Sequence, residues 1–245
     1  MATLARRSLN RIIDTHSGKI YGRVLDIGGE KEKSIEGWDK TKIKNNYTKW
    51  DFLNIDKRYN PDLLGSADNI PCKDQEYDCA ICFELLEHVK DPVKVIKEIN
   101  RVLKNKGLLF LSMPFMYRHH PNPFDMQRWS SEKIHIELEN NNFKVKIVET
   151  RGGWLVVLFD ILINGLLSFK KKTFFSSFFF SLFGFIFAKF FLFLTLLIFF
   201  LKDFLKNEKN TSSNFHRYTT GFFVIAEKIT NHKPTKPKNY MKKYH

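Results

Sequence analysis

The chain has 245 residues, with 40 Lys and Arg against 26 Asp and Glu, and a formal net charge of +14. This length suffices for one α/β domain with a sizeable core and a further segment. The charge favours an anionic partner, but no basic and aromatic strand motif accompanies it, so we expect no nucleic acid. The cysteines, Cys72, Cys79 and Cys82, have neither the spacing nor the histidines of a zinc site, and we expect no metal.

Apolar patterns along the chain alternate between strand and helix periods. The expected elements, in chain order, are a basic helix within 1–20, strands at 23–27, 50–56 and 77–83, a helix from 92, a strand at 108–113, a helix to about 139 and a strand at 143–150. Asp91 and Pro92 are typical of a helix start, and Gly107 is typical of the left-handed residue that ends one. This alternation predicts an α/β fold, a parallel sheet with helices on both faces.

The stretch 24–30 has the pattern of a buried strand that enters a nucleotide-binding turn. Gly28 and Gly29 follow the strand, where only small residues fit and backbone amides can face a ligand. In an open parallel sheet, ligands bind beyond the carboxyl ends of the strands, which is where Asp26 and Asp56 fall. Asp56 is placed to accept hydrogen bonds from ribose hydroxyls; a turn or helix cap is its alternative role.

A more specific succession of phrases follows from residue 78 onward. It consists of Leu-Glu-His-Val at 86–89, Asp-Pro at 91–92, Arg-Val-Leu at 101–103 and a glycine-led strand at 107–114 that ends in proline. This succession resembles the class I S-adenosylmethionine-dependent methyltransferases of the type 11 subgroup. The resemblance implies a Rossmann-like, seven-stranded, mostly parallel sheet, with a last strand at 219–228 antiparallel to the strand at 143–150.

The same resemblance implies S-adenosylmethionine as the cofactor and a set of residues that would contact it. Gly28 and Gly29 would approach its methionine part, Asp56 would hold the ribose, and Ser66 stands where the family has an adenine-contacting aspartate. The implied set is Asp26, Gly28, Gly29, Asp56, Ser66 and Ala67, with Phe83 and Glu84 beneath the transferring methyl group. Glu30 and Glu32 replace two family glycines and would approach the cofactor's carboxylate.

Two segments supply candidate catalytic and substrate-binding residues. His88 is a candidate base, although Glu87 and His88 could instead cap the next helix. The segment 120–130 resembles a phrase found after the fifth strand in methyltransferases of surface-glycan gene clusters. Its side chains could bind a polar acceptor and deprotonate a hydroxyl, or Asp125 and Arg128 could pair across a turn. The candidates are His88, His120 and Asp125 for catalysis, and His119, Arg128 and Trp129 for substrate binding.

The segment 154–206 departs from the family pattern. Within it, 174–201 holds one charge, Lys189, and a helix of that length would exceed a hydrocarbon core of ~30 Å. Because strands of one sheet flank the insertion, it must cross a membrane an even number of times or not at all. Crossings at 154–169 and 178–201 would place Asp160 in the membrane and 170–172 on the far side. A re-entrant or in-plane pair of helices avoids both.

We therefore expect three parts: a methyltransferase domain at 1–153 and 218–228, a hydrophobic membrane-associating insertion at 154–206 and a basic tail at 229–245. The arginine-rich start lacks the apolar stretch of a secretory signal, so we expect a catalytic domain on the cytoplasmic side of a membrane. The expected function is methyl transfer to a membrane-proximal acceptor, a surface glycan or lipid-linked intermediate. The alternatives are a lipophilic small molecule, such as a quinone precursor, and a catalytically silent membrane scaffold.

Overall fold

The computed structural model describes residues 3–29, 46–121, 124–168, 184–187, 189–194 and 218–230. The chain divides into two compact units. The first comprises residues 1–115, 119–151 and 221–245, and the second comprises residues 116–118 and 152–220. The residues predicted to bind the cofactor and to act in catalysis belong to the first unit.

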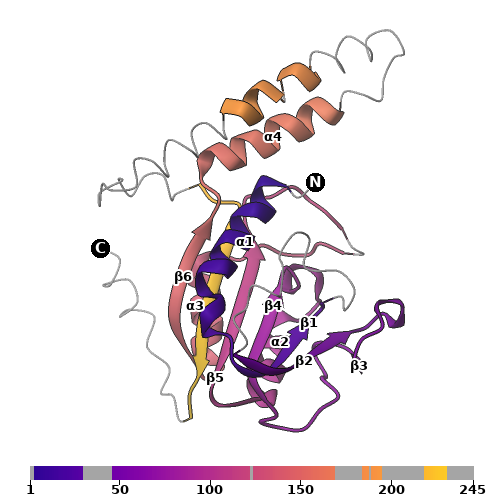
Figure 1. Ribbon diagram of the computed structural model, residues 1–245, viewed down its shortest axis with the longest axis vertical. Coiled ribbons are helices and arrows are strands. Elements are labelled where there is room, and N and C mark those ends of the chain that lie inside the picture. The colour runs from indigo at the N-terminus through magenta and orange to yellow at the C-terminus, as the bar shows by residue number, and fades with distance from the viewer. Residues whose placement is uncertain are drawn as a thin grey trace. The chain divides into compact units, whose positions relative to one another are not determined.

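A seven-stranded mixed sheet forms the centre of the first unit, in the order β3-β2-β1-β4-β5-β7-β6 (Figure 1). The strands are β1 (Gly22–Ile27), β2 (Tyr47–Asn54), β3 (Leu63–Leu64), β4 (Tyr77–Phe83), β5 (Leu103–Pro114), β6 (Phe143–Arg151) and β7 (Gly221–Lys228). The pairs among β1 to β5 are parallel, whereas β7 runs antiparallel to both β5 and β6. The predicted Rossmann-like sheet with an antiparallel last strand is confirmed.

Helices cover both faces of this sheet, as predicted. They are α1 (Leu4–His16), α2 (Pro92–Val102) and α3 (Ser131–Asn140), with 3-10 turns η1 (Ser17–Lys19), η3 (Lys57–Tyr59) and η4 (Leu86–His88). On one face, Leu9 of α1 packs with Val24 and Phe223. On the other face, α2 and α3 pack against the alternate strand residues, such as Leu25. Side chains of a strand point alternately to its two faces, so both faces are apolar and both need a cover.

The end of α2 differs from the prediction. The helix begins as expected, with the Asp91 side chain accepting the backbone N–H of Lys94 at 3.0 Å. It stops at Val102, because the next residue is already extended and opens β5. Gly107 is not the left-handed cap, since the positive φ falls on Lys106. A Cβ on Gly107 would lie 3.0 Å from the carbonyl oxygen of Asp78, so glycine is needed there for close backbone packing.

The second unit contains α4 (Trp154–Ser168) and helical residues at 184–187 and 189–194. Within the part of the chain that the structure describes, no helix has both the length and the apolar character of a membrane span. The 15 residues of α4 fall short of the ~20 that a span requires. The crossing considered at 154–169 is therefore not supported. Most of 174–201, the lysines at 170–172 and nearly all of the tail lie outside the described residues.

Candidate functional site

The glycine turn follows β1 at the carboxyl edge of the sheet, next to β4. The strand order reverses between these two strands, and ligands of open α/β sheets bind at such a point. Gly28 has a φ of +80°, and a Cβ there would lie 3.1 Å from the Leu85 side chain. A Cβ on Gly29 would lie 2.6 Å from the Asp26 carboxylate. Both positions therefore require glycine. Glu30 and Glu32 lie outside the described residues.

The two acids at the strand ends already have partners in the chain. Asp26 is buried and lies 3.4 Å from the indole nitrogen of Trp50, which donates to it. Asp56 caps η3, where it accepts the backbone N–H of Arg58 at 2.9 Å and three guanidinium hydrogen bonds from the same residue. These hydrogen bonds from Arg58 lower the pKa of Asp56. Asp56 thus stands at the predicted edge and also takes the capping role considered as its alternative.

The turn after β3 contains Asp68, an acidic residue that was not among the candidates predicted from the sequence. The Ser66 hydroxyl donates to the Asp68 carboxylate at 2.5 Å, and Lys94 lies 3.3 Å from the same group. Asn69 donates its backbone N–H to the carbonyl of Ser66, which closes the turn, and Ala67 packs partly buried on the core. The turn therefore keeps a carboxylate two residues after the position where the family pattern places one.

Glu84 follows β4 and joins three strands through its side chain. Its carboxylate accepts from the Ser112 hydroxyl at 3.0 Å and from the Arg151 guanidinium at 2.8 Å. Burial raises the pKa of Glu84, but the charge and hydrogen bond of Arg151 outweigh it, and the net pKa is lowered. The backbone of Glu84 is left-handed, with φ of +52°. The neighbouring Phe83 packs on Phe223, with ring centroids 5.9 Å apart.

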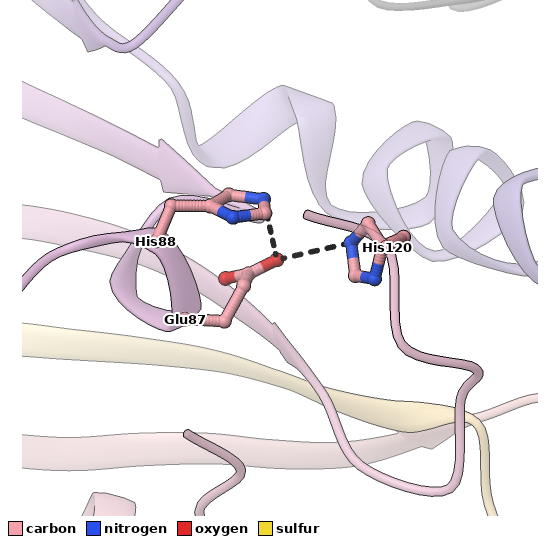
Figure 2. A group of neighbouring side chains, drawn as sticks. All are labelled: Glu87, His88 and His120. Atoms are coloured by element: carbon pink, nitrogen blue, oxygen red, sulfur yellow. Dashed lines mark ion pairs between the residues drawn. The ribbon is translucent and has the colours of Figure 1, made fainter. Parts of the chain in front are cut away.

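Glu87, His88 and His120 form a cluster at the same edge, which we call the Glu-His-His cluster (Figure 2). The Glu87 side chain is fully buried, and its Oε1 lies 3.7 Å from Nε2 of His88 and 3.8 Å from Nε2 of His120. Among the described residues, none donates a hydrogen bond to either carboxylate oxygen. Burial, followed by the nearby charge of Glu84, raises the pKa of Glu87 to about 8.

The loop that carries His120 is tied to η4. Met126 donates its backbone N–H to the carbonyl of Glu87 at 2.8 Å. The Gln127 amide donates to the carbonyls of Leu86 and Val89, both at 3.0 Å. Trp129 in turn donates its indole N–H to Gln127. These bonds fix the second candidate segment beside the first, which the sequence could not show.

Asp125 and Arg128 do pair, and the pair also positions His120. Both guanidinium nitrogens of Arg128 contact the Asp125 carboxylate. Asp125 also accepts the backbone N–H of His120 at 2.9 Å and lies 3.3 Å from its Nδ1. The hydrogen bonds from Arg128 hold the pKa of Asp125 well below its usual range. Asp125 is therefore a permanent anion that orients the imidazole, not a proton acceptor.

Two predicted substrate-binding residues lie away from the cluster, and one alternative role is excluded. Trp129 is only 7% exposed and packs in the core. His119 is exposed and does not join the Glu-His-His cluster among the described residues. The alternative in which Glu87 and His88 cap α2 is wrong, because Asp91 is the cap.

Comparisons with known proteins agree with this architecture. A family model described as methyltransferase domain matches residues 1–145. The chain is similar to the ubiquinone biosynthesis O-methyltransferase of Hydrogenovibrio crunogenus, with 33% identity over 60 residues, 24% of this chain and 25% of that protein. It is also similar to a Probable S-adenosylmethionine-dependent methyltransferase of Mycolicibacterium smegmatis, with 23% identity over 150 residues, 58% of this chain and 56% of that protein. The chain thus spans from a quarter to little more than half of these relatives.

A solved structure extends the likeness over more of the chain. The crystal structure of the cyclase SpnF matches with a TM-score of 0.52 and 15% identity, over 91% of this chain and 82% of that chain. At this identity the likeness shows the fold alone. Because this fold also occurs in a cyclase, the fold alone does not determine which reaction a protein catalyses; the residues of its active site do.

Proposed function

The chain belongs to the family of S-adenosylmethionine-dependent methyltransferases, and on this premise we propose that it transfers a methyl group to a hydroxyl oxygen of a membrane-proximal acceptor. The observation that carries the hydroxyl assignment is the Glu-His-His cluster. Two imidazoles and a buried carboxylate meet there at the carboxyl edge of β4, beside the glycine turn. Hydroxyl oxygens are poor nucleophiles until they lose a proton, and imidazole is the side chain that most often accepts it.

The residues at the edge of the sheet fit the cofactor. The turn at Gly28 and Gly29 leaves little room for a Cβ, so the backbone stays unobstructed where a ligand would approach. Asp26 and Asp56 offer carboxylate oxygens, which suit the cofactor's amino group and ribose hydroxyls. Glu84 adds an ionised carboxylate at the end of β4, where Arg151 pairs with it. When bound, the cofactor supplies an already activated methyl group, so positioning of the acceptor is the protein's main contribution.

The two imidazoles are oriented toward one place. The Nδ1 of His88 lies 2.5 Å from the carbonyl oxygen of Phe124, which can only accept, so Nδ1 carries the proton. The Nδ1 of His120 lies beside the Asp125 carboxylate. The Nε2 atom of His88 therefore keeps its lone pair, and it lies on the side of Glu87, as does Nε2 of His120. An acceptor hydroxyl held there meets the lone pair of His88, which favours loss of its proton.

Cofactor binding is the first test. S-adenosylhomocysteine, titrated calorimetrically into the full chain, should bind with one site per chain. Absence of heat at millimolar ligand would contradict every enzymatic function and leave the catalytically silent scaffold. Methyl transfer is then followed with cofactor labelled in the methyl group, using membrane lipid, lipid-linked sugar and phenolic acceptors.

Activity variants test the role of the cluster. Replacing His88 or His120 with Ala should lower kcat by about 10²–10⁴-fold, the usual contribution of proton transfer. His135→Gln is the matched control, because His135 pairs with Glu139 on α3, away from the cluster. An unchanged kcat in the His88 and His120 variants would remove the hydroxyl assignment.

A lipophilic phenol, such as a quinone precursor, is the second candidate acceptor. The observation in its favour is the similarity to a ubiquinone biosynthesis O-methyltransferase. A phenol has a pKa near 10, so it needs less help in losing its proton than a sugar hydroxyl. Faster transfer of the labelled methyl group to the phenol than to the lipid-linked sugar would favour this candidate.

We further propose that the segment 154–206 attaches the protein to the cytoplasmic face of a membrane. The supporting observation is that α4 exposes Trp154, Leu158, Ile161 and Leu162, which recur at helical spacing. Such an apolar stripe suits the interface plane. The full chain should sediment with membranes until detergent is added. A soluble full chain, or a deletion of 170–205 that leaves its partitioning unchanged, would contradict the attachment.

A further inference from the structure

The Glu87 carboxylate has an unusual environment. The side chain is fully buried, and neither oxygen accepts a hydrogen bond from a described residue. Burying a carboxylate without partners is expensive, so buried charges are normally paired or coordinate a metal ion. The groups nearest to Oε1 are the Nε2 atoms of His88 and His120, at 3.7 and 3.8 Å. A cation placed between the carboxylate and the two ring nitrogens would satisfy the buried Glu87 oxygens.

The surroundings of the two imidazoles resemble the outer shell of a metal site. Histidine ligands generally donate their second ring N–H to a carbonyl or carboxylate, which fixes the tautomer and the ring orientation. Here the Phe124 carbonyl takes that place for His88 at 2.5 Å. For His120, the Asp125 carboxylate lies 3.3 Å from Nδ1, and the Arg128 nitrogen lies 3.5 Å from the same atom. The positive charge of Arg128 is compensated by its double contact with Asp125.

The spacing of the three groups is close to that of a coordination sphere. One ligand atom from each residue lies within 4.8 Å of the other two. Zinc bonds of about 2.0–2.1 Å in tetrahedral geometry separate ligand atoms by about 3.4 Å. The two contacts of Glu87 are within a few tenths of an ångström of this value. Small rotations of the partly exposed imidazoles would complete the site.

We propose that Glu87, His88 and His120 bind a divalent transition-metal ion, with Zn²⁺ as the best match. Two histidines and one glutamate form a known catalytic zinc set, in which the fourth position stays open for water or substrate. Imidazole and carboxylate ligands favour such an ion over Mg²⁺, which prefers oxygen ligands and octahedral geometry. We expected no metal from the sequence, because the ligands of this site come from two segments that only the fold brings together.

The role of the ion in the reaction rests on the proposed function. An acceptor hydroxyl in the open position would have its pKa lowered by the metal, as bound water does. The imidazoles would then act as ligands and not as proton acceptors. The two modes differ in their response to a chelator: transfer that survives complete removal of metal would exclude the metal mode.

Zinc titration tests the site without any turnover. The full chain is freed of metal with EDTA, dialysed and titrated with ZnCl₂ in a calorimeter. One equivalent should bind, and Glu87→Gln and His120→Ala should each weaken the affinity at least about 100-fold, since even outer-shell changes cost about 10–100-fold. His119→Ala removes the neighbouring imidazole outside the cluster and should leave the affinity within about threefold.

Two controls separate the possible failures. Each variant is first titrated with S-adenosylhomocysteine in the absence of zinc, and an affinity equal to that of the natural chain shows that the domain is folded. X-ray absorption of the zinc-loaded chain should show two imidazole ligands at about 2.0–2.1 Å. The proposal is overturned if the natural chain binds no zinc, or if folded variants bind it equally well. Zinc binding without S-adenosylhomocysteine binding would instead contradict the proposed function alone.

Discussion

Replacing Arg151 with Met should destabilise the domain through a buried carboxylate far away in sequence. Arg151 is 2% exposed and Glu84 is 16% exposed, so solvent screens their interaction little. Removing one partner of a buried ion pair typically costs about 3–5 kcal/mol. The Ser112 hydroxyl still donates to Glu84 in the variant, which places the expected loss in unfolding free energy near the lower end, about 3 kcal/mol.

The loss should depend on pH in a defined direction. In the natural chain the pKa of Glu84 is lowered, so its stabilisation is present above the unfolded-state pKa of about 4.3 and fades as the pH falls through the lower folded value. In Arg151→Met, burial without the cation raises the pKa of Glu84 above about 4.3. The variant is then penalised at neutral pH, and the penalty disappears as the acid takes up its proton. The difference between the two chains should therefore shrink toward pH 4.

Urea unfolding followed by tryptophan fluorescence at pH 7.5 and pH 4.5 measures both effects. The double variant Glu84→Gln with Arg151→Met removes the unpaired charge and should recover most of the loss, because neutral replacement of a buried pair is often tolerated. The reasoning fails if the single variant loses less than about 1 kcal/mol at pH 7.5. It also fails if the double variant is no more stable than the single one.

Three further substitutions test other contacts. Gly29→Ala would place a Cβ 2.6 Å from the Asp26 carboxylate, so calorimetry should show S-adenosylhomocysteine affinity reduced at least about tenfold; unchanged binding would remove this turn from the cofactor site. Gly221→Ala would place a Cβ 2.5 Å from the carbonyl oxygen of Met113, and urea unfolding should show that the free energy of unfolding falls by about 1–3 kcal/mol. An unchanged free energy would mean that β5 and β7 can move apart enough to accommodate the methyl group. Burial raises the pKa of Asp51, but hydrogen bonds from a lysine and an arginine outweigh it and lower the pKa. Its stabilisation is present above the unfolded pKa of about 3.9 and lost below it, so Asp51→Asn should flatten the acid limb of a plot of melting temperature against pH, and an unaltered limb would refute the linkage.

The fold was accessible from the sequence because its signals are local. Apolar periods located the strands, and the pair Asp91 and Pro92 located the start of α2. The end of α2 was missed, because a glycine can serve a left-handed turn or a close backbone contact with equal ease. Only the packing of Gly107 against Asp78 decides between them. Turn chemistry read from one residue type is therefore less informative than periodicity read over many.

The site was accessible only in part, because its decisive contacts are not local. His88 and His120 were singled out by separate phrases, yet nothing in the sequence placed them on either side of Glu87. The pairing of Glu84 with Arg151 joins residues of two strands and has no sequence signal. Trp129 was predicted to bind substrate because it belongs to the phrase at 120–130 that resembles other methyltransferases, whereas in the structure its side chain is buried in the core.

The position of β7 has a consequence for synthesis of the chain. This last strand, yellow in Figure 1, lies between β5 and β6. Until the ribosome has released residues 221–228, β6 has no neighbour in the sheet, and Leu9 of α1 lacks Phe223 as a packing partner. The packing of α1, the first helix to be synthesised, is therefore complete only after β7, the last strand, has been synthesised. The segment between β6 and β7 leaves the ribosome before the sheet can be completed. Binding of that segment to another partner during synthesis would therefore compete with the pairing of β7.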